Sequence, residues 1–465
     1  METLDETRYD AIVIGAGQAG VPLAKDLARS GRRTALIEHN HLGGTCVNVG
    51  CTPSKTMVAS ARVAHLANRS ADYGVETGPI EVDLARVLER KRAIVEQFRS
   101  GTERGIEQTQ GLDLYRGRAL FTGPRSLTIA MNTGDERRLA SEQIFINAGG
   151  RPSTPDLPGL DQVAFLDSTS IMELSNLPEH LIVLGGGYFG LEFGQMFRRF
   201  GSRVTIVQRG SQLIGREDSD IASAVLDILE EDGIDILLDT EASGVAAHAE
   251  GLALSVNGKE GARSISGSHL LVATGRTPNA DLLDLAAAGI ETDERGYITV
   301  DEKLATTVEG VFALGDIKGG PAFTHISYDD YRILRSNVIE AGNASTMNRM
   351  VPYVVFIDPQ LGRIGLSEAE ARSQDRQVRV ASMPMSSVAR ALEVDETRGV
   401  MKVVIDAQSE RILGAAILGL EGGEVMAMVQ IAMMGDLPYT ALRAGIFAHP
   451  TLAESFNNLF ATLEG

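Results

Sequence analysis

Short apolar runs alternate with helical stretches along most of the chain, beginning near its N-terminus. Residues 10–14 are mostly apolar, residues 21–30 place apolar side chains at helical spacing, and residues 34–37 form a second apolar run. Short apolar runs bounded by turns are typical of parallel strands buried on both faces. The pattern predicts a strand–helix–strand unit and an α/β fold with parallel sheets.

A glycine-rich turn joins the first strand of this unit to its helix. Gly15, Gly17 and Gly20 follow the strand, and Glu38 stands at the end of the next strand. Such glycines let the backbone approach a pyrophosphate at a helix N-terminus, while the carboxylate bonds ribose hydroxyls. We therefore expect a dinucleotide site. The alternative is a glycine-rich turn in an ordinary α/β fold.

The same order of elements returns after residue 179. Apolar runs at residues 180–184 and 204–207 enclose a helical pattern, and Gly185, Gly187 and Gly190 repeat the glycine turn. Two turns of this kind predict two dinucleotides.

The second block lacks the acidic residue of the first. Gln208 stands at the position equivalent to Glu38, and Arg209 follows it. A cation in place of the carboxylate accommodates a 2′-phosphate, so the sequence favours NADPH over NADH. Arg216 is a second candidate phosphate contact. The alternative is that Arg209 is an ordinary solvated charge.

The only two cysteines, Cys46 and Cys51, lie in a glycine-flanked polar stretch. Pro53 fits the first turn of a helix, which places Cys51 where backbone N–H groups favour a thiolate. Lys55 lies on the same helix face and adds positive charge. Gly50 allows the distortion that a bridge between the two cysteines needs. We expect a redox-active pair. The alternative is two free cysteines packed as small apolar residues.

Small residues also end later strands. Residues 143–152 and 270–279 have similar glycine-containing ends, which indicate crossovers between domains. Asp316 follows the apolar strand 311–314, where its carboxylate would face the sugar-like chain of a flavin. The alternative is a simple turn aspartate.

The chain changes character from about residue 347, where strand-like segments alternate with helices. The Met- and Ala-rich helix at residues 425–434 is more typical of packing than of a cofactor site. His449 and Glu454 are close in sequence and are candidates for a base and its orienting carboxylate. A histidine near the surface without a role is the alternative.

Composition narrows the classes of function. The formal net charge of -19 argues against nucleic acid or an anionic membrane as the main partner. No apolar run approaches the roughly 20 residues that span a bilayer. The acidic N-terminus is unlike a signal peptide, so we expect a cytoplasmic protein, where a disulfide is usually catalytic.

These motifs together resemble the FAD-dependent pyridine nucleotide–disulfide oxidoreductases, and residues 43–55 look most like the mercuric reductase branch. The resemblance implies two Rossmann-like dinucleotide-binding domains, for FAD and NAD(P)H, plus an α+β dimerisation domain. The implied segments are residues 1–150 and 280–345 for FAD, 151–279 for NAD(P)H, and 346–465 for the interface of a homodimer.

The resemblance also implies roles for single residues. Cys51 would be the charge-transfer thiolate beside the flavin, and Cys46 the outer, interchange thiol. Lys55 would lie near the flavin and pair with Glu192, while Tyr188 would gate the nicotinamide pocket. His449 of the partner subunit, oriented by Glu454, would be the acid–base for Cys46. Further cofactor-binding positions are Gly44, Thr45, Gly149, Gly275 and Gly315.

The predicted function is an NADPH-dependent flavoprotein reductase that passes electrons through Cys46 and Cys51. The acceptor stays open between a small disulfide, a thiophilic metal ion and an oxidised electrophile. Dihydrolipoamide dehydrogenase and a glutathione-type reductase are the alternatives within the family. A redox-responsive flavin-containing interaction protein is the alternative from another class.

Overall fold

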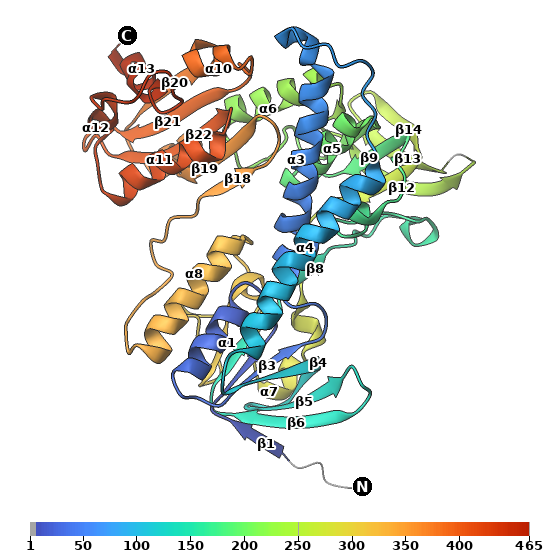
Figure 1. The fold of residues 1–465 in the computed structure, drawn as a ribbon, viewed down its shortest axis with the longest axis vertical. Helices are drawn as coiled ribbons and strands as arrows, with labels where there is room; N and C mark the ends of the chain where they lie inside the picture. Colours follow the sequence, from blue (N-terminus) through green and yellow to red (C-terminus); the bar gives the residue numbers. More distant parts are fainter. Residues whose placement is uncertain (1–5, 250, 465) are drawn as a thin grey trace. The chain divides into compact units, whose positions relative to one another are not determined.

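The computed structural model describes residues 6–249 and 251–464, which form two compact units. The first unit comprises residues 1–56, 86–153 and 275–349, and the second comprises residues 57–85, 154–274 and 350–465. Figure 1 labels the elements. The helices are α1 (Gly20–Arg29), α2 (Gly44–Val49), α3 (Cys51–Asn68), α4 (Leu84–Glu107), α5 (Tyr188–Phe200), α6 (Ser219–Glu231), α7 (Leu285–Ala288), α8 (Thr324–Leu334), α9 (Glu368–Ser373), α10 (Ala389–Glu393), α11 (Gly422–Met434), α12 (Tyr439–Arg443) and α13 (Ser455–Ala461).

The first unit is built on one mixed sheet with the order β1-β6-β5-β4-β3-β2-β7-β17. Strands β3, β2, β7 and β17 run parallel, whereas β4 pairs parallel with β3 and antiparallel with β5. Strands β8 and β16 form a separate antiparallel pair. The bounds are β1 (Glu6–Tyr9), β2 (Ala11–Ile14), β3 (Thr34–Glu38), β4 (Leu112–Gly123), β5 (Ser126–Met131), β6 (Glu136–Ser141), β7 (Ile144–Ile146), β8 (Gly150–Pro152), β16 (Arg276–Pro278) and β17 (Val311–Ala313).

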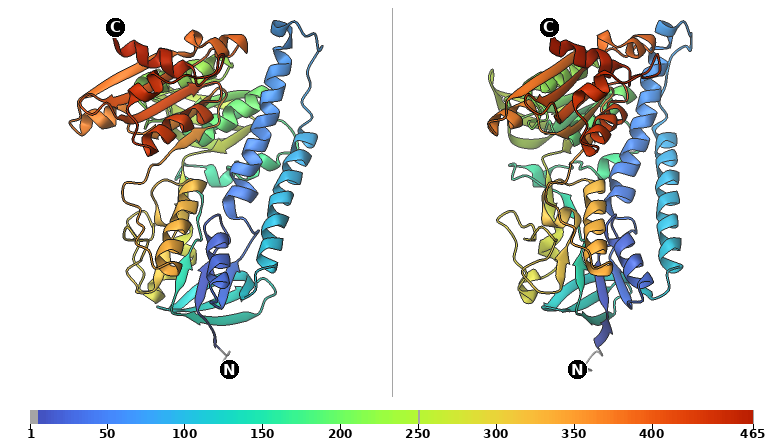
Figure 2. Two further views of the ribbon diagram at one scale, coloured as in Figure 1. Left: turned by 60° about the vertical axis from the view of Figure 1, so that its left-hand side comes forward. Right: turned by 90° about the vertical axis from the view of Figure 1, so that its left-hand side faces the viewer.

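Helix α1 covers the parallel part of this sheet. Its apolar face is fully buried through Leu23 and Leu27, because these side chains recur at the spacing of one helical turn. Helix α8 lies beside α1 (Figure 2), and the Tyr331 hydroxyl donates to Asp26 Oδ2 at 2.6 Å between them. The packing fixes the N-terminus of α1 at the end of β2.

The second unit contains three sheets. A parallel sheet has the order β11-β10-β9-β15, a small antiparallel sheet has β12-β13-β14, and a C-terminal antiparallel sheet has β18-β19-β22-β21-β20. The bounds are β9 (His180–Leu184), β10 (Arg203–Val207), β11 (Asp235–Leu237), β12 (Glu241–His248), β13 (Gly251–Gly258), β14 (Gly261–Gly267), β15 (His269–Val272), β18 (Tyr353–Val355), β19 (Gln360–Gly365), β20 (Val378–Pro384), β21 (Val400–Asp406) and β22 (Ile412–Gly419).

The apolar runs predicted to be parallel strands are strands, and both glycine turns lead into helices. The sheet β12-β13-β14 and strand β19 escaped the sequence analysis. Strand β12 buries only Val245 among its residues, so its sequence lacks the apolar alternation of a half-buried strand. The domain boundaries themselves remain a prediction.

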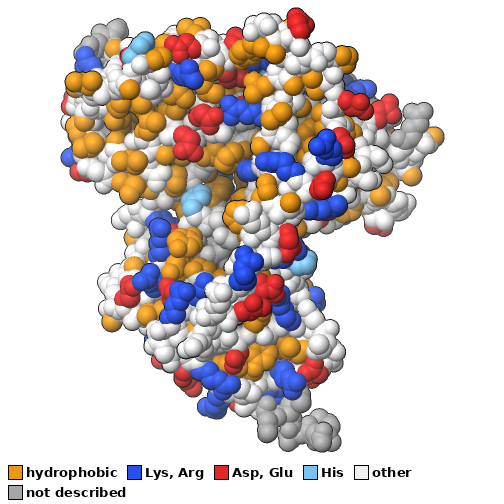
Figure 3. Space-filling view, in the orientation of Figure 1, with side chains coloured by type: hydrophobic (Ala, Val, Ile, Leu, Met, Phe, Trp, Pro, Cys, Tyr) orange, Lys and Arg blue, Asp and Glu red, His pale blue; other side chains and the backbone are white. Residues whose placement is uncertain are grey.

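Exposed apolar side chains occur on and just after α11. Met428, Ile431, Met434 and Leu437 are all exposed, and Figure 3 shows hydrophobic side chains gathered over this C-terminal region. An apolar face of this kind is typical of a protein interface. None of the helices in the described part of the chain combines the length and apolarity that a bilayer crossing needs.

Candidate functional site

The first glycine turn, residues 15–20, is closed by backbone contacts that only glycine permits. A Cβ on Gly20 would lie 2.0 Å from the Gly15 carbonyl oxygen, and one on Gly15 would lie 2.3 Å from the Asn147 carbonyl oxygen. The φ angle of Gly15 is +101°, which L side chains rarely adopt. The end of β2, the turn and α1 therefore pack at backbone distance.

Two side chains hold this turn in place. Glu38 is buried, and its Oε2 accepts a hydrogen bond from Ala16 N at 2.9 Å. Asn147 Oδ1 accepts from Gly20 N at 2.9 Å, while its Nδ2 donates to Leu314 O at 3.0 Å. The carboxylate and the amide thus fix the turn from β3 and β7, the two strands that flank β2.

The turn fits an anionic cofactor. Within the described residues, the backbone N–H groups of Gly17, Gln18 and Ala19 donate no hydrogen bond, although they lie at the N-terminus of α1. Unpaired N–H groups at this position bind the pyrophosphate of a dinucleotide. Glu38 retains lone pairs for ribose hydroxyls beyond its bond to Ala16.

The cysteine stretch packs directly onto this turn. Gly43 N donates to Ala16 O at 2.9 Å, and a Cβ on Gly44 would lie 2.7 Å from Gly17 Cα. Thr45 is exposed on α2. The two cysteines are therefore held next to the dinucleotide turn by residues of the same unit.

Helices α2 and α3 are separated at Gly50, whose backbone has φ −127° and ψ −122°. Its Cβ would lie 2.8 Å from Thr45 O, so glycine is needed here for close approach rather than for a left-handed conformation. Cys51 is the first residue of α3, and Lys55 follows one turn later. Asn48 secures α2 by donating to Leu42 O and Gly44 O, both at 2.9 Å.

Both cysteines are thiols in this structure, with Cys46 half-buried and Cys51 exposed. A hydrogen bond with Cys51, together with burial, raises the pKa of the Cys46 thiol above its ordinary value. Thr324, the first residue of α8, places its hydroxyl oxygen 3.6 Å from Cys51 Sγ. Exposure alone does not select Cys46 as the outer thiol, so the division of roles remains a prediction.

Asp316 lies on a tightly held turn in the same unit. Burial raises the pKa of its carboxyl group, against the opposing charges of Arg276 and Lys318. The preceding Gly315 has φ +74° and donates its N–H to the fully buried Asp330 at 2.9 Å. Since the Asp316 side chain makes no hydrogen bond within the described ranges, it fits a ligand hydroxyl.

The crossover segments end at Gly149 and Gly275, which flank the pair β8–β16. The φ angle of Gly149 is +63°, and its O accepts a hydrogen bond from Asn279 N at 3.0 Å. Gly275 has φ +141°, and its O accepts from Ser153 N at 3.0 Å. Both glycines therefore lie where the chain enters or leaves this strand pair.

The second glycine turn, residues 185–190, repeats the geometry of the first. A Cβ on Gly190 would lie 2.1 Å from Gly185 O, and one on Gly185 would lie 2.6 Å from Ala273 O. Gly187 precedes α5 and has open space around its Cβ position. Gln208 Oε1 accepts from Gly186 N at 3.0 Å, as Glu38 does from Ala16 N in the first turn.

The remaining coenzyme candidates surround this second turn. Arg209 and Arg216 are exposed on the loop after β10. Tyr188 begins α5 and packs on Phe189 with ring centroids 4.9 Å apart. Glu192, one turn further, is buried and accepts from Phe356 N at 2.9 Å. Because Lys55 and Glu192 lie in different units, their pairing remains a prediction.

His449 and Glu454 lie together in the C-terminal part of the second unit. The distance between His449 Nδ1 and Glu454 Oε2 is 2.8 Å, and the histidine side chain is 69% exposed. The arrangement can hold one ring tautomer while the other nitrogen faces outward. The role of the pair remains a prediction.

Sequence reasoning missed three residues that shape the first unit. Asn147, Thr324 and Asp330 contact the glycine turn, Cys51 and Gly315, respectively. None belongs to a local motif, since each partner is more than ten positions away in the chain. The polar Asn147 at the end of an apolar strand is the one signal that the sequence offered.

Comparison with known proteins gives matches over almost the whole chain. The family described as "Pyridine nucleotide-disulphide oxidoreductase" matches residues 9–330, and its "dimerisation domain" matches residues 351–460. The probable pyridine nucleotide-disulfide oxidoreductase RclA of Escherichia coli (strain K12) is 38% identical, over 98% of this chain and 100% of that protein. A mercuric reductase of Staphylococcus aureus is 32% identical, over 96% of this chain and 81% of that protein.

A solved structure agrees with these matches. The Cu(II) complex of the HOCl-induced flavoprotein disulfide reductase RclA from Escherichia coli has a TM-score of 0.90 and 37% identity, covering 98% of this chain and 100% of that chain. The predicted fold class and the use of FAD with a pyridine nucleotide are confirmed. The chain therefore belongs to the pyridine nucleotide–disulphide oxidoreductases, enzymes that use FAD together with NADH or NADPH.

Proposed function

We propose that this protein is an NADPH-dependent reductase that passes two electrons through Cys46 and Cys51 to a disulfide or to a thiophilic metal ion or oxidant. The observation that carries the proposal is the packing of the cysteine stretch on the first glycine turn, where Gly43 N bonds Ala16 O. Bound FAD supplies the two-electron chemistry between coenzyme and dithiol. The chain's own residues bind it, orient it and handle the protons.

Proton handling centres on Cys46. Its raised pKa means that the thiol needs a base before it attacks an acceptor. His449, held by Glu454 at 2.8 Å, is the proposed base. Because the chain carries the family's dimerisation domain, we propose a homodimer in which His449 of the partner subunit serves each Cys46.

The acceptor is proposed by class. A disulfide takes up two electrons and two protons, whereas two Cu(II) ions take up one electron each. The similarity to mercuric reductases and to a reductase solved with Cu(II) supports including thiophilic metal ions beside disulfides among the candidates. Thiolates are good ligands for soft metals, which suits the exposed Cys51.

An anaerobic stopped-flow screen tests the proposal. The enzyme is reduced with one equivalent of NADPH and mixed with lipoamide, glutathione disulfide, Hg(II), Cu(II) or hypochlorite, while flavin absorbance is followed. We expect fast reduction by NADPH and fast reoxidation by at least one acceptor that fails with Cys46→Ser. Reduction followed by a stall with every acceptor would instead favour a redox-responsive interaction protein. Reoxidation of Cys46→Ser at the wild-type rate would overturn the dithiol route.

A further inference from the structure

The coenzyme loop, residues 208–218, joins β10 to α6 and is folded back onto the second glycine turn at two points. Gln208 Oε1 accepts from Gly186 N at 3.0 Å, and Ile214 N donates to Gly186 O at 2.9 Å. The exposed Arg209 and Arg216 stand on this loop. Arg209 is placed by its neighbours, since Gln208 N donates to Leu237 O at 2.9 Å and Asp239 N donates to Gly210 O at 3.0 Å. The place of Arg216 depends on the C-terminal end of the loop.

The coenzyme loop contains a residue in a strained backbone conformation. Ile214 has φ +39°, a left-handed conformation that a β-branched residue rarely adopts. Such a conformation persists only where the surroundings enforce it. Glu217 N donates to Ile214 O at 2.9 Å, and Gln212 Nε2 donates to Glu217 O at 3.0 Å. The backbone of Glu217 thus holds the C-terminal half of the loop through its bonds to Ile214 and Gln212.

Glu217 is clamped by the C-terminal sheet. Its side chain is 2% exposed, and its Oε2 lies 3.3 Å from Nε of Arg363 on β19, whose side chain is 6% exposed. The Tyr353 hydroxyl on β18 donates to Glu217 Oε1. Burial and the Glu217 charge raise the pKa of Tyr353, so it keeps its proton, while Arg363 and Arg216 act in the opposite direction. Arg216 therefore lies within electrostatic reach of the clamp.

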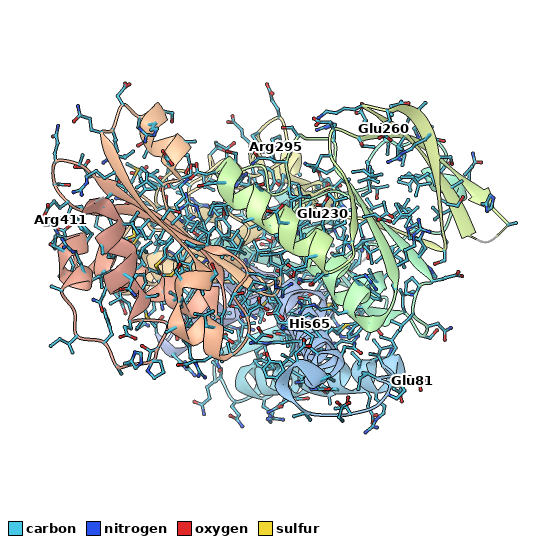
Figure 4. The ribbon with its side chains drawn as sticks, turned by 90° about the horizontal axis from the view of Figure 1, so that it is seen from above. His65, Glu81, Glu230, Glu260, Arg295 and Arg411 are labelled. Atoms are coloured by element: carbon cyan, nitrogen blue, oxygen red, sulfur yellow. The ribbon has the colours of Figure 1, made fainter. Side chains whose placement is uncertain are left out.

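Asp218 extends the same attachment. Its carboxylate accepts from Glu368 N at 2.9 Å and Ala369 N at 3.0 Å, at the start of α9. It also forms an ion pair at 3.1 Å with Lys402 on β21. The Lys402 side chain is 5% exposed. Figure 4, where Glu230 marks α6, shows this helix alongside the C-terminal sheet.

We propose that Tyr353 and Arg363 of the C-terminal sheet are positioning residues for coenzyme selection, because they hold Glu217 and thereby place the adjacent Arg216 for the 2′-phosphate of NADPH. The inference rests on the NADPH preference proposed above. It assigns to the region matched by the dimerisation domain a part in selecting the coenzyme. Neither residue touches the coenzyme in this account.

Steady-state kinetics of Tyr353→Phe with both coenzymes test the inference. The substitution removes only the hydroxyl that holds Glu217 and keeps the ring in place. We expect KM for NADPH to rise about 5- to 10-fold, which is less than the full effect of one lost hydrogen bond to a charged group, because Tyr353 acts only through the loop. The value of kcat and both constants for NADH stay within a factor of about two. Glu217→Gln is the second variant and weakens the pairing with Arg363 instead.

Arg398→Gln is the matched control. Arg398 is half-buried and pairs with Asp232 at 2.8 Å, so its loss breaks an ion pair between the same two regions of the chain. Its partners Asp232, Glu396 and Asp358 lie outside the coenzyme loop. We expect lower thermal stability with an unchanged ratio of KM for NADPH to KM for NADH. Combining Tyr353→Phe with Arg216→Ala should add no further loss, since the clamp acts through this arginine.

The outcomes separate the inference from the proposed function. A wild-type preference for NADPH that Tyr353→Phe and Glu217→Gln leave intact overturns the inference alone. Equal changes for NADPH and NADH, or the same change in Arg398→Gln, also overturn it, because they report general destabilisation. A wild-type enzyme without NADPH preference overturns both the coenzyme proposal and the inference built on it.

Discussion

The two glycine turns have the same backbone geometry but are held by different side chains. In each, a side chain at the end of the second strand accepts a hydrogen bond from the backbone N–H that follows the first glycine: Glu38 accepts from Ala16, and Gln208 accepts from Gly186. The hydrogen bond to the turn is the same in both sites, but the second site has a neutral glutamine in place of the carboxylate. Charge at this position, rather than backbone shape, therefore distinguishes the two sites.

A second difference lies in the third strand of each site. Asn147 follows β7 and bonds both Gly20 N and Leu314 O, whereas Ala273 follows β15 and has no polar side chain. In the first site, the Asn147 side chain therefore fixes the turn from a strand of the same sheet. The loop beside the second turn is instead held by Tyr353 and Arg363. The first turn is thus held by a residue of its own sheet, whereas the loop beside the second turn is held by residues of a different sheet.

The largest expected effect comes from filling the first turn. In Gly20→Ala, the new Cβ would meet the Gly15 carbonyl oxygen at 2.0 Å. We expect FAD affinity to fall about 100-fold, equivalent to about 2.7 kcal/mol, because the turn has to open. Flavin titration of the apoprotein measures this. Gly187→Ala is the control, since its Cβ meets no atom within 4 Å, and it should retain FAD fully. Equal FAD loss in both variants would contradict the comparison.

Exchanging the two side chains tests the role of charge. Gln208→Glu keeps an acceptor for Gly186 N but places a carboxylate near the 2′-phosphate. We expect kcat/KM for NADPH to fall about 10- to 100-fold and that for NADH to rise, as expected for one charge-assisted contact of about 1.5–3 kcal/mol. Glu38→Gln should weaken FAD and leave the coenzyme ratio unchanged. If the ratio of kcat/KM for NADPH to kcat/KM for NADH stays constant in Gln208→Glu, the charge argument is refuted.

The smallest effect is expected from removing the Asn147 side chain. Asn147→Ala leaves Gly20 N and Leu314 O without their side-chain partner, as in the second site. We expect the free energy of unfolding to fall by about 1–2 kcal/mol, since water can replace part of the lost bonding. Denaturant unfolding of the FAD-bound enzyme measures it. An unchanged midpoint would show that the Asn147 side chain is dispensable.

Local pattern was enough for both glycine turns and for the strands and helices that flank them, because their signals lie within about 30 residues of one another. Local pattern could not predict contacts between segments that are far apart in the sequence. The Asn147 bond to Gly20 spans 127 positions and the Tyr353 bond to Glu217 spans 136. In the sequence, Glu217 and Arg363 look like ordinary surface charges, and only the fold reveals that both are buried. The site roles inherited from family resemblance remain predictions.

Anaerobic reductive titration of the wild type, Cys46→Ser and Cys51→Ser with NADPH tests the central claim, that electrons leave through this cysteine pair. The account predicts that Cys51→Ser loses the long-wavelength charge-transfer band. In Cys46→Ser the band is kept or strengthened, because the Cys51 thiolate can no longer enter a disulfide. Identical spectra for the two variants, or a band that survives in Cys51→Ser, would contradict it.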